Sequence, residues 1–375
     1  MDGANPTPVS MRAIVANKPT AMGKPNWNLE HVNLRELDSN ELLIRMVATG
    51  VCHTDMIFAS MPSEAGAYPK VLGHEGAGYV HKIGSEVQNA IVGDSVLLSF
   101  QSCSICKNCK ANHPSYCQQF QAMNLGGEQG VFEMTSGSKA SGAFFGQSSF
   151  SSYAIVKESS TVKVTELVNN EEELKLFAPM GCGFQTGIGT VENLTAAGSQ
   201  DTIVIIGLGG VGLTAIMAAK MKGCAMIIGV DRVLARLEMA TSFGATHVLN
   251  TSDNKLDLTQ EIKTLTGGNG STITIDTTGN LGLIASGMDF TGLRGQMVLL
   301  GVPPMDASLA VNLFSFMQTG KRLLGSIEGD VTPSEWYREG KLPIDKILKF
   351  YPVEEFQLAM SEMDAGVTIK PIITW

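Results

Sequence analysis

The sequence predicts an α/β protein in which a β-rich domain is joined to a doubly wound parallel sheet. At 375 residues the chain is long for one hydrophobic core and of ordinary length for two. Up to about residue 180, short β segments are separated by Gly, Pro and Asn, whereas from Gly183 onward strand and helix patterns alternate. We therefore expect one domain to comprise residues 1–183 and 328–375, and the other to comprise residues 184–327.

Short apolar segments in the first region have the composition and the flanking turn residues of strands. They are Met11–Ala16, Glu41–Val47, Ser95–Phe100 and Tyr153–Val156. The C-terminal segment Thr368–Thr374 predicts one more strand, which returns to this domain. Short strands with long loops predict a compact β-rich domain.

The second region alternates between strand and helix patterns, as expected of a parallel sheet covered by helices. The predicted strands are Thr202–Ile206, Ala225–Val230, Ile273–Ile275 and Gln296–Leu300, and the predicted helices are Val211–Met221 and Val233–Phe243. The apolar run from Thr202 to Ala219 contains a glycine-rich turn, which favours a strand, a turn and a helix over a membrane span.

A glycine motif lies between the first predicted strand and helix of this region. It contains Gly207, Gly209, Gly210 and Gly212. In this context the first glycine permits a tight turn, the second lets the backbone approach a pyrophosphate, and the third lets the helix pack on the strand. The pattern predicts a dinucleotide site, and the alternative is a glycine turn that serves packing alone.

Asp231 ends the next predicted strand, where an acidic residue can accept a hydrogen bond from the adenosine ribose. A carboxylate there repels a 2'-phosphate, so the sequence favours NAD over NADP. Arg232, beside it, weakens this preference.

Four cysteines form a loop with the spacing Cys103-x2-Cys106-x2-Cys109-x7-Cys117, in residues 103–117. Four thiolates on a short loop with no room for a helix or strand predict a closed tetrahedral zinc site, which is structural rather than catalytic. Two disulfides or an iron–sulfur cluster are the alternatives. Both are disfavoured, because the N-terminal sequence Met-Asp-Gly-Ala-Asn-Pro lacks the pattern of a secretory signal, which predicts a cytoplasmic location.

Three further candidate ligands, Cys52, His74 and Cys182, are spread along the chain. Alone, each has an ordinary structural explanation as a small buried side chain or a hydrogen-bonded histidine. Together they match the Cys2His set of a catalytic zinc that keeps a fourth position open. Asp55 is placed to orient the imidazole, and Glu75, next to His74, is placed behind the metal.

Composition limits the class of partner. The chain is 44% hydrophobic and 17% charged, and its net charge is −9 with no long cluster of Lys and Arg. These values are ordinary for a globular protein and argue against nucleic acid or an anionic membrane as a partner.

The chain resembles the zinc-dependent, medium-chain alcohol dehydrogenase family from about Met11 to its C-terminus. The most specific elements are Gly73-His-Glu-Gly76 with Gly78, the four-cysteine loop, Gly181-Cys-Gly183 and the glycine motif. The resemblance implies a GroES-like catalytic domain, a Rossmann domain and an active site between them. It also implies two zinc ions per chain, and hydride transfer that interconverts a primary alcohol and its aldehyde with NAD.

The same resemblance assigns roles to individual positions. Thr54 corresponds to the hydroxyl that hands on the alcohol proton, and His53 corresponds to a residue that contacts the pyrophosphate. The remaining cofactor positions that it implies are Thr186, Val211, Val302, Arg236 and Lys370, the last near the phosphates. It further implies a homodimer or homotetramer joined at sheet edges, for which the apolar segment Leu309–Phe316 is the expected buried edge.

Two departures distinguish this chain from better-known members. Ile57 stands where some members carry a proton-relay histidine, and the segment 330–340 looks shorter than its counterpart. The segments Gly181–Gly189 and Gly325–Gly329, like Ile57, resemble the branch that acts on benzyl and other aryl alcohols.

Three phenylalanines, Phe100, Phe144 and Phe145, are expected near the substrate, which would suit aromatic or allylic alcohols, although such residues are as often plain core. The alternatives are a dehydrogenase for aliphatic or secondary alcohols and a catalytically inactive member that still binds NAD and zinc.

Overall fold

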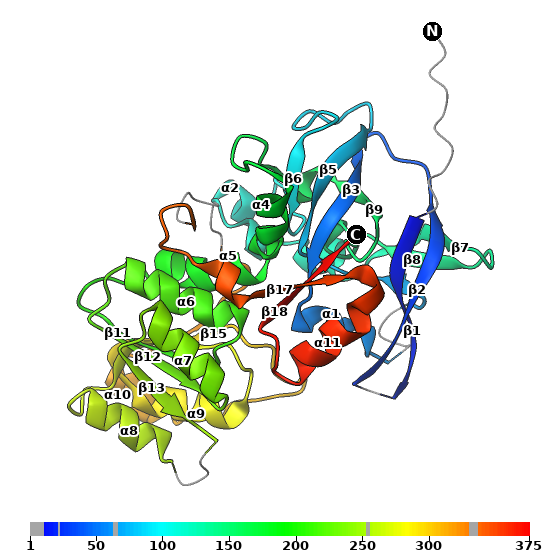
Figure 1. Cartoon of the computed structure of the whole chain (residues 1–375). Helices are drawn as coiled ribbons and strands as arrows, with labels where there is room; N and C mark the ends of the chain where they lie inside the picture. The colour runs from blue at the N-terminus through cyan, green and yellow to red at the C-terminus, as the bar shows by residue number, and fades with distance from the viewer. Residues whose placement is uncertain (1–10, 22, 63–66, 253–255, 330–336) are drawn as a thin grey trace. The chain divides into compact units, whose positions relative to one another are not determined.

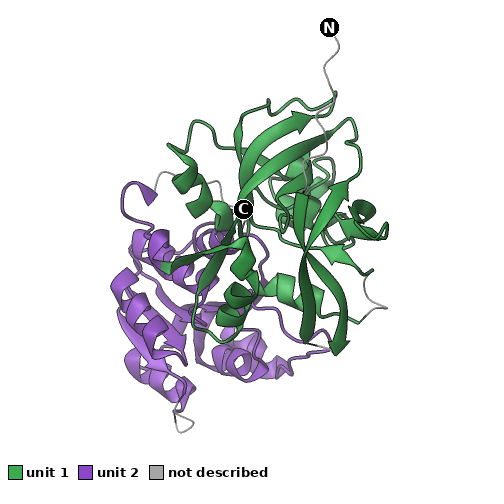
Figure 2. Ribbon diagram, turned by 45° about the vertical axis from the view of Figure 1, so that its right-hand side comes forward, with its two compact units in different colours: residues 1–182, 347–375 green, residues 183–346 purple. Residues whose placement is uncertain are grey.

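The computed structural model describes residues 11–21, 23–62, 67–252, 256–329 and 337–375. The chain divides into two compact units, of which unit 1 comprises residues 1–182 and 347–375 and unit 2 comprises residues 183–346 (Figure 2). The boundary before residue 347 lies later than the predicted one after residue 327, because residues 328 and 329 pack on unit 2. There Gln185 donates a hydrogen bond of 2.9 Å to Glu328, and Gly189 leaves space for the carbonyl of Gly329. Most of the 330–340 segment lies outside the described residues.

Unit 1 contains a closed barrel with the strand order β1-β2-β7-β8-β4 (Figure 1). Its strands are β1 (Met11–Ala21), β2 (Lys24–Leu34), β4 (Lys70–Val71), β7 (Glu128–Met134) and β8 (Lys139–Gly142). The barrel encloses an apolar core that includes Ile14, Val71 and Phe132, all at most 1% exposed. Of these strands, the sequence analysis placed only β1.

A second sheet of unit 1 carries the segments around the candidate metal ligands. Its order is β10-β6-β5-β3-β18-β17, and β9 also pairs with β3. The strands are β3 (Glu41–Gly50), β5 (Gly76–Ile83), β6 (Ser95–Leu98), β9 (Tyr153–Lys157), β10 (Thr161–Lys163), β17 (Leu348–Pro352) and β18 (Lys370–Thr374). The prediction that the C-terminal strand returns to this domain is confirmed, because β18 pairs antiparallel with β3.

The helices of unit 1 are short and lie in the connections between its strands. They are α1 (His53–Ala59), α2 (Lys107–Lys110), α3 (Phe120–Asn124), α4 (Glu171–Leu176) and α11 (Phe356–Asp364). The turn of helix in α2 corrects the expectation that the four-cysteine loop has no room for a helix. One turn needs only four residues, and those that follow Cys106 supply them.

Unit 2 is a fully parallel sheet with the order β13-β12-β11-β14-β15-β16, the doubly wound order that the alternating pattern predicted. Its strands are β11 (Thr202–Ile206), β12 (Met226–Asp231), β13 (His247–Asn250), β14 (Ser271–Asp276), β15 (Thr291–Leu299) and β16 (Arg322–Gly325). In such sheets, ligands bind at the carboxyl ends of the strands, where the order reverses around β11 and β14.

The helices of unit 2 are α5 (Gly183–Gly189), α6 (Gly210–Met221), α7 (Leu234–Phe243), α8 (Leu258–Leu265), α9 (Leu281–Phe290) and α10 (Leu313–Thr319). Ile262 of α8 and Phe290 of α9 pack on one face of the sheet, against Val204, Ile206 and Ile228. Of these six helices, only α6 and α7 were predicted from the sequence. The strand, turn and helix predicted for Thr202–Ala219 are confirmed, and among the described helices none is long and apolar enough to cross a membrane.

Candidate functional site

The four cysteines of the 103–117 loop lie together in unit 1. Their sulfur atoms are all within 4.8 Å of one another, and none of the seven cysteines of the chain forms a disulfide. Backbone N–H groups point at the sulfurs: those of Cys103 and Gln119 donate to Cys117 Sγ, and that of Cys106 donates to Cys103 Sγ, each at 3.4 Å. Backbone donors from Cys109 and Gln118 lower the pKa of the Cys106 thiol to about 6. Backbone donors also lower the pKa of Cys103, whereas burial and the neighbouring thiols raise the pKa of Cys109 to about 12. The backbone therefore favours the zinc-binding thiolate form at Cys103 and Cys106.

A second cluster brings together residues from three distant segments of unit 1. Cys52 caps the N-terminus of α1, His74 and Glu75 lie between β4 and β5, and Cys182 follows a 3-10 turn at Ala178–Gly181. One ligand atom from each of these four residues lies within 4.8 Å of the others. The Cys2His set and the acidic neighbour that were predicted from sequence therefore meet in space.

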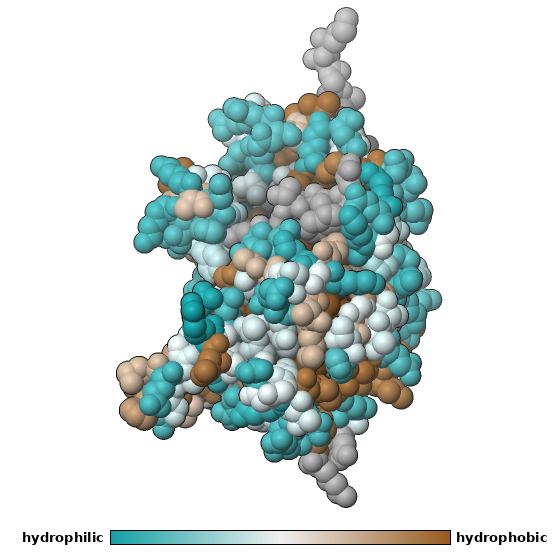
Figure 3. Space-filling model, turned by 90° about the vertical axis from the view of Figure 1, so that its left-hand side faces the viewer, coloured by the Kyte–Doolittle hydropathy of each residue, from teal (hydrophilic) through white to brown (hydrophobic). Residues whose placement is uncertain are grey.

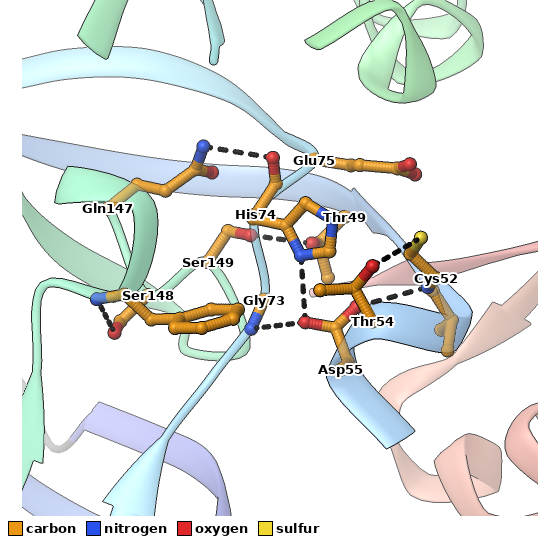
Figure 4. Close-up of polar contacts among 12 residues, drawn as sticks. Thr49, Cys52, Thr54, Asp55, Gly73, His74, Glu75, Gln147, Ser148 and Ser149 are labelled. Carbon is orange, nitrogen blue, oxygen red and sulfur yellow. Dashed lines mark hydrogen bonds and ion pairs between the residues drawn. The ribbon is translucent and has the colours of Figure 1, made fainter. Parts of the chain in front are cut away.

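Asp55 holds two of these segments in place (Figure 4). Its Oδ2 accepts the backbone N–H of Cys52 at 3.0 Å, which caps the first turn of α1. Its Oδ1 accepts the N–H of Gly73 at 3.0 Å and contacts His74 Nδ1 at 2.9 Å. When Nδ1 donates to this carboxylate, the lone pair of the imidazole is left on Nε2, the atom available for a metal.

The His74 imidazole is fully buried, and its Nε2 has no hydrogen-bond partner among the described residues. Burial lowers the pKa of His74, but the Asp55 carboxylate and the neighbouring Cys52 together raise it well above its ordinary value, so a metal that binds Nε2 displaces a proton from the ring. The interaction with Cys182, assisted by the charge of Lys370, holds the pKa of Cys52 well below its ordinary value. Two sulfurs and an unpartnered nitrogen at this spacing fit a zinc ion.

Glu75 lies behind this group and pairs with Lys370 of β18. The Lys370 ammonium is 2.6 Å from Glu75 Oε1, and it also donates to the carbonyl of Val51 at 3.1 Å. Gly50 makes the arrangement possible, because a Cβ there would lie 2.0 Å from Glu75 Oε2. The structure therefore places Lys370 beside the candidate metal ligands of unit 1, and its contact with cofactor phosphates stays a prediction.

Two phenylalanines expected near the substrate pack directly on His74. The Phe145 ring stacks on the His74 ring at 4.6 Å, and the Phe144 ring meets it edge-on at 5.7 Å. Both phenylalanines are at most 5% exposed, whereas Phe100 is half-buried and packs on Phe120. Phe144 and Phe145 therefore fix the imidazole plane, a role that the sequence analysis did not foresee.

The proton-relay candidates lie on α1. Thr54 is half-buried, and its hydroxyl oxygen is 3.7 Å from Cys52 Sγ, whereas His53 and Ile57 are exposed.

Gln147, which was not predicted from the sequence, is fully buried and forms hydrogen bonds to the backbone on both sides of Glu75. No spacing pattern marks this residue, since it lies in an ordinary Gly-Gln-Ser-Ser run.

The glycine motif of unit 2 has the geometry that the sequence predicted. Gly207 adopts a φ of 90°, and a Cβ on Gly212 would lie 1.9 Å from the carbonyl oxygen of Gly207, so α6 packs tightly on the turn. A Cβ on Gly209 would meet nothing within 4 Å. The backbone at Gly209 is therefore open to a ligand, at the N-terminus of α6.

Asp231 ends β12 and stabilises the turn of the glycine motif through hydrogen bonds. Its Oδ2 accepts the N–H of Leu208 at 2.7 Å, its Oδ1 accepts the N–H of Val233 at 2.9 Å, and the Arg236 guanidinium is 3.9 Å away. Arg232 is exposed. Asp231 therefore lies where a ribose is expected, with a cation beside it.

The other predicted cofactor positions of unit 2 lie in or near its loops and helix starts. Thr186 lies in α5, Val211 in the first turn of α6, and Val302, which is 61% exposed, in the loop after β15.

Comparison with known proteins identifies similar sequences and folds. Residues 38–166 match the alcohol dehydrogenase GroES-like domain, and residues 210–342 match the zinc-binding dehydrogenase domain. The chain is 35% identical to a geraniol dehydrogenase from Castellaniella defragrans, over 92% of this chain and 94% of that protein.

Two solved structures have the same fold. One is an alcohol dehydrogenase zinc-binding domain protein from Burkholderia ambifaria, with a TM-score of 0.90, and the other is the benzyl alcohol dehydrogenase from Acinetobacter calcoaceticus, with a TM-score of 0.87. Each is 35% identical to this chain, and the alignments cover 98% of this chain and 99% of each structure. These matches confirm the family resemblance, the GroES-like and Rossmann fold class, and an oxidoreductase that uses zinc and NAD(P).

The two glycines provide a matched test of the cofactor turn. We expect Gly212→Ala to lower the free energy of unfolding by about 1–3 kcal/mol, because its Cβ collides with a backbone carbonyl that cannot rotate away. Gly209→Ala has open space around it and should change stability by less than about 1 kcal/mol while weakening the binding of NAD. Chemical denaturation and calorimetric titration with NAD measure both effects. A Gly209→Ala variant that binds NAD with unchanged affinity would contradict the assignment.

Proposed function

Because the chain belongs to the zinc-binding alcohol dehydrogenases, we propose that Cys52, His74 and Cys182 hold a catalytic zinc ion, with Glu75 behind it, and that the protein interconverts a primary alcohol and its aldehyde. When bound, the zinc supplies a Lewis acid for the alcohol oxygen, and the nicotinamide supplies a hydride acceptor. The observation that supports this most strongly is the buried Nε2 of His74, unpartnered and within 4.8 Å of the other ligand atoms.

We assign a second, structural zinc to Cys103, Cys106, Cys109 and Cys117. Four sulfur ligands complete a tetrahedral shell and leave no position for a substrate. The N–H groups directed at the sulfurs compensate part of the thiolate charge and hold the loop in its metal-binding shape.

Thr54 is the residue that we assign to the alcohol proton. Its hydroxyl lies beside Cys52 Sγ, next to the cluster, and a hydroxyl both accepts and donates a proton. Ile57 offers no titratable group, so the proton leaves through the exposed His53 or directly to water.

Asp231 supports a preference for NAD over NADP. Its carboxylate lies at the end of β12, at the carboxyl end of the sheet, where the adenosine ribose binds in this fold. There it repels a 2'-phosphate. Arg236, 3.9 Å from the carboxylate, offsets part of that repulsion, so we expect a preference rather than an exclusion. The other residues that we assign to the cofactor are His53, Thr186, Gly207, Gly209, Gly210, Val211, Gly212, Arg232, Val302 and Lys370.

We propose aromatic or allylic primary alcohols as the substrates. The two 35% identical relatives that are named for a substrate are named for geraniol, an allylic alcohol, and benzyl alcohol. The aromatic rings of Phe144 and Phe145 lie against the ligand histidine, which supports a site with apolar aromatic surroundings. Aliphatic or secondary alcohols are the alternative.

Metal content tests the function directly. We expect two zinc ions per chain, one of which is lost in Cys182→Ala together with at least about 10²-fold in kcat/KM, because Lewis-acid help is worth several kcal/mol. The fold of this variant should persist, whereas Cys106→Ser should lose the other ion and unfold more readily. Cys224→Ala is the matched control, since this buried cysteine belongs to neither cluster. One metal or none in the unmodified protein, measured by elemental analysis, would overturn the proposal.

The proton path is tested at Thr54. We expect Thr54→Ala to lower kcat/KM by about 10²-fold or more and Thr54→Ser to keep most of it, because only the hydroxyl transfers the proton. His53→Gln should alter the pH dependence and weaken NAD binding. Ile57→Val serves as the control on the same helix. A pH profile of Thr54→Ala that matches the unmodified enzyme would show that the proton is lost directly to water.

Paired alcohols test the substrate class. Benzyl alcohol against cyclohexylmethanol, and geraniol against citronellol, differ mainly in the unsaturation next to the reacting carbon. We expect the unsaturated member of each pair to have at least about a tenfold higher kcat/KM, which corresponds to about 1.4 kcal/mol in the transition state. Equal values within both pairs would favour the aliphatic alternative. Repeating the assay with NADP measures the cofactor preference.

We propose that the protein is a homodimer or homotetramer and that it is cytoplasmic. The edge of the unit 2 sheet nearest this segment in sequence is β16, whereas the predicted edge segment Leu309–Phe316 lies in a loop and in α10. Leu313, Phe314 and Met317 of α10 are each at least 66% exposed. Hydrophobic residues also gather on the surface drawn in Figure 3. An open edge beside an apolar helix supports pairing with a second copy.

Sedimentation at micromolar concentration tests this assembly. It should give at least twice the chain mass of 39.9 kDa, and a mass equal to that of one chain would contradict the proposal.

A further inference from the structure

Gln147 uses its whole amide group to bind backbone close to the cluster of Cys52, His74, Glu75 and Cys182. Its Nε2 donates to the carbonyl of His74 and to the carbonyl of Ser99, each at 3.0 Å, and its Oε1 accepts the N–H of Gly76 at 3.1 Å. The side chain is fully buried. The amide therefore ties the turn that carries His74 and Glu75 to the end of β6.

Ser99 continues this connection to the third ligand segment. Its Oγ donates to the carbonyl of Gly181 at 2.7 Å, directly before Cys182. The backbones lie so close here that a Cβ on Gly181 would be 1.9 Å from the carbonyl oxygen of Leu98. The position of the Cys182 segment is thus set by the same strand end that Gln147 holds.

These contacts complete a chain of hydrogen bonds through all three ligand segments. Asp55 joins the Cys52 segment to His74, Gln147 joins the backbone of His74 to Ser99, and Ser99 joins to the residue before Cys182. In Figure 4, Asp55 meets the imidazole of His74 while Gln147 meets its main-chain carbonyl. The histidine is therefore held at both ends.

We propose that Gln147 is a positioning residue that sets the distance between His74 and Cys182, and so controls how tightly the cluster retains its metal. This inference rests on the zinc site proposed above. Loss of the amide removes the hydrogen-bond partner of the His74 and Ser99 carbonyls and of the Gly76 N–H, and the His74 and Cys182 segments are then no longer joined through it. Residues that orient metal ligands in this way typically alter metal affinity or activity by about 10- to 100-fold.

Gln147→Met tests the proposal, because it keeps the length of the side chain and removes all three hydrogen bonds. Asn124→Leu is the matched control. Asn124 is also a fully buried amide with three hydrogen bonds to backbone, but its partners are Gln101 and Phe120. Ser99→Ala removes the next link with a smaller change.

The first measurement is the rate at which a chelator removes the zinc ion assigned to Cys52, His74 and Cys182. This ion is the one that Cys182→Ala is expected to lack. We expect at least about tenfold faster release in Gln147→Met, a smaller acceleration in Ser99→Ala, and the unmodified rate in Asn124→Leu. The second is the visible absorption of the cobalt-substituted protein, whose bands should shift in Gln147→Met and not in Asn124→Leu. A loss of packing alone would not produce this difference between two equivalent amides.

Unmodified release and unmodified cobalt bands in Gln147→Met would overturn the proposal. If Gln147→Met does not fold, the rate of zinc release from Ser99→Ala tests the proposal instead. A rate equal to that of the unmodified protein would overturn it. Failure of the zinc assignment gives a different result, because Cys182→Ala would then contain as much zinc as the unmodified protein.

Discussion

The candidate metal site depends on one buried carboxylate, that of Asp55. It accepts the N–H groups of Cys52 and Gly73 and contacts the imidazole of His74, all within 3.0 Å. Because the side chain is fully buried, its charge is tolerated only while these partners stay in place. The first turn of α1 and the turn before β5 are therefore fixed relative to each other by the same group that leaves His74 Nε2 available for a metal.

Glycines then allow the segments to approach. Gly50 makes room for the Glu75 carboxylate, and Gly181 makes room for the carbonyl of Leu98. Gly73 has a φ of 89° and would place a Cβ 2.4 Å from the nitrogen of Phe150. Any side chain at these positions would push apart the backbones that carry the ligands. The precision of the site is thus a property of the backbone packing of unit 1 as much as of the ligand side chains.

These constraints explain what could be predicted from the sequence. Local spacing and residue chemistry predicted the strand, turn and helix around Gly207–Gly212, the carboxylate at the end of β12, and the four cysteines of the 103–117 loop. Cys52, His74, Glu75 and Cys182 lie far apart in the sequence, and only their combination and the family resemblance pointed to one site. The partners of Lys370 and the role of Gln147 could not be predicted in this way, since each contacts residues more than 70 positions away. Helices α8 and α9 were not predicted although Asp257 and Asn280 cap them, because α8 is only eight residues long and α9 contains two glycines, which weaken a helical pattern. The sheet edge was also misplaced: Leu309–Phe316 is apolar enough for a strand, but Asn312 accepts the N–H of Ser315 and starts a helix.

Charge balance links the Glu75–Lys370 pair to the metal. Two thiolates and Glu75 would place three negative charges close together in the interior of unit 1, a costly arrangement without compensation. The buried ammonium of Lys370 neutralises Glu75 through contacts of 2.5 and 2.6 Å, so the charges of Cys52 and Cys182 remain for a dication. The ammonium is also part of the reason that the pKa of Cys52 is low. Lys370 comes from the C-terminal strand, so the return of β18 to β3 supplies the cation that lets two thiolates and a carboxylate share one buried site. The last strand of the chain is therefore part of the candidate metal site, although it contributes none of the proposed ligands.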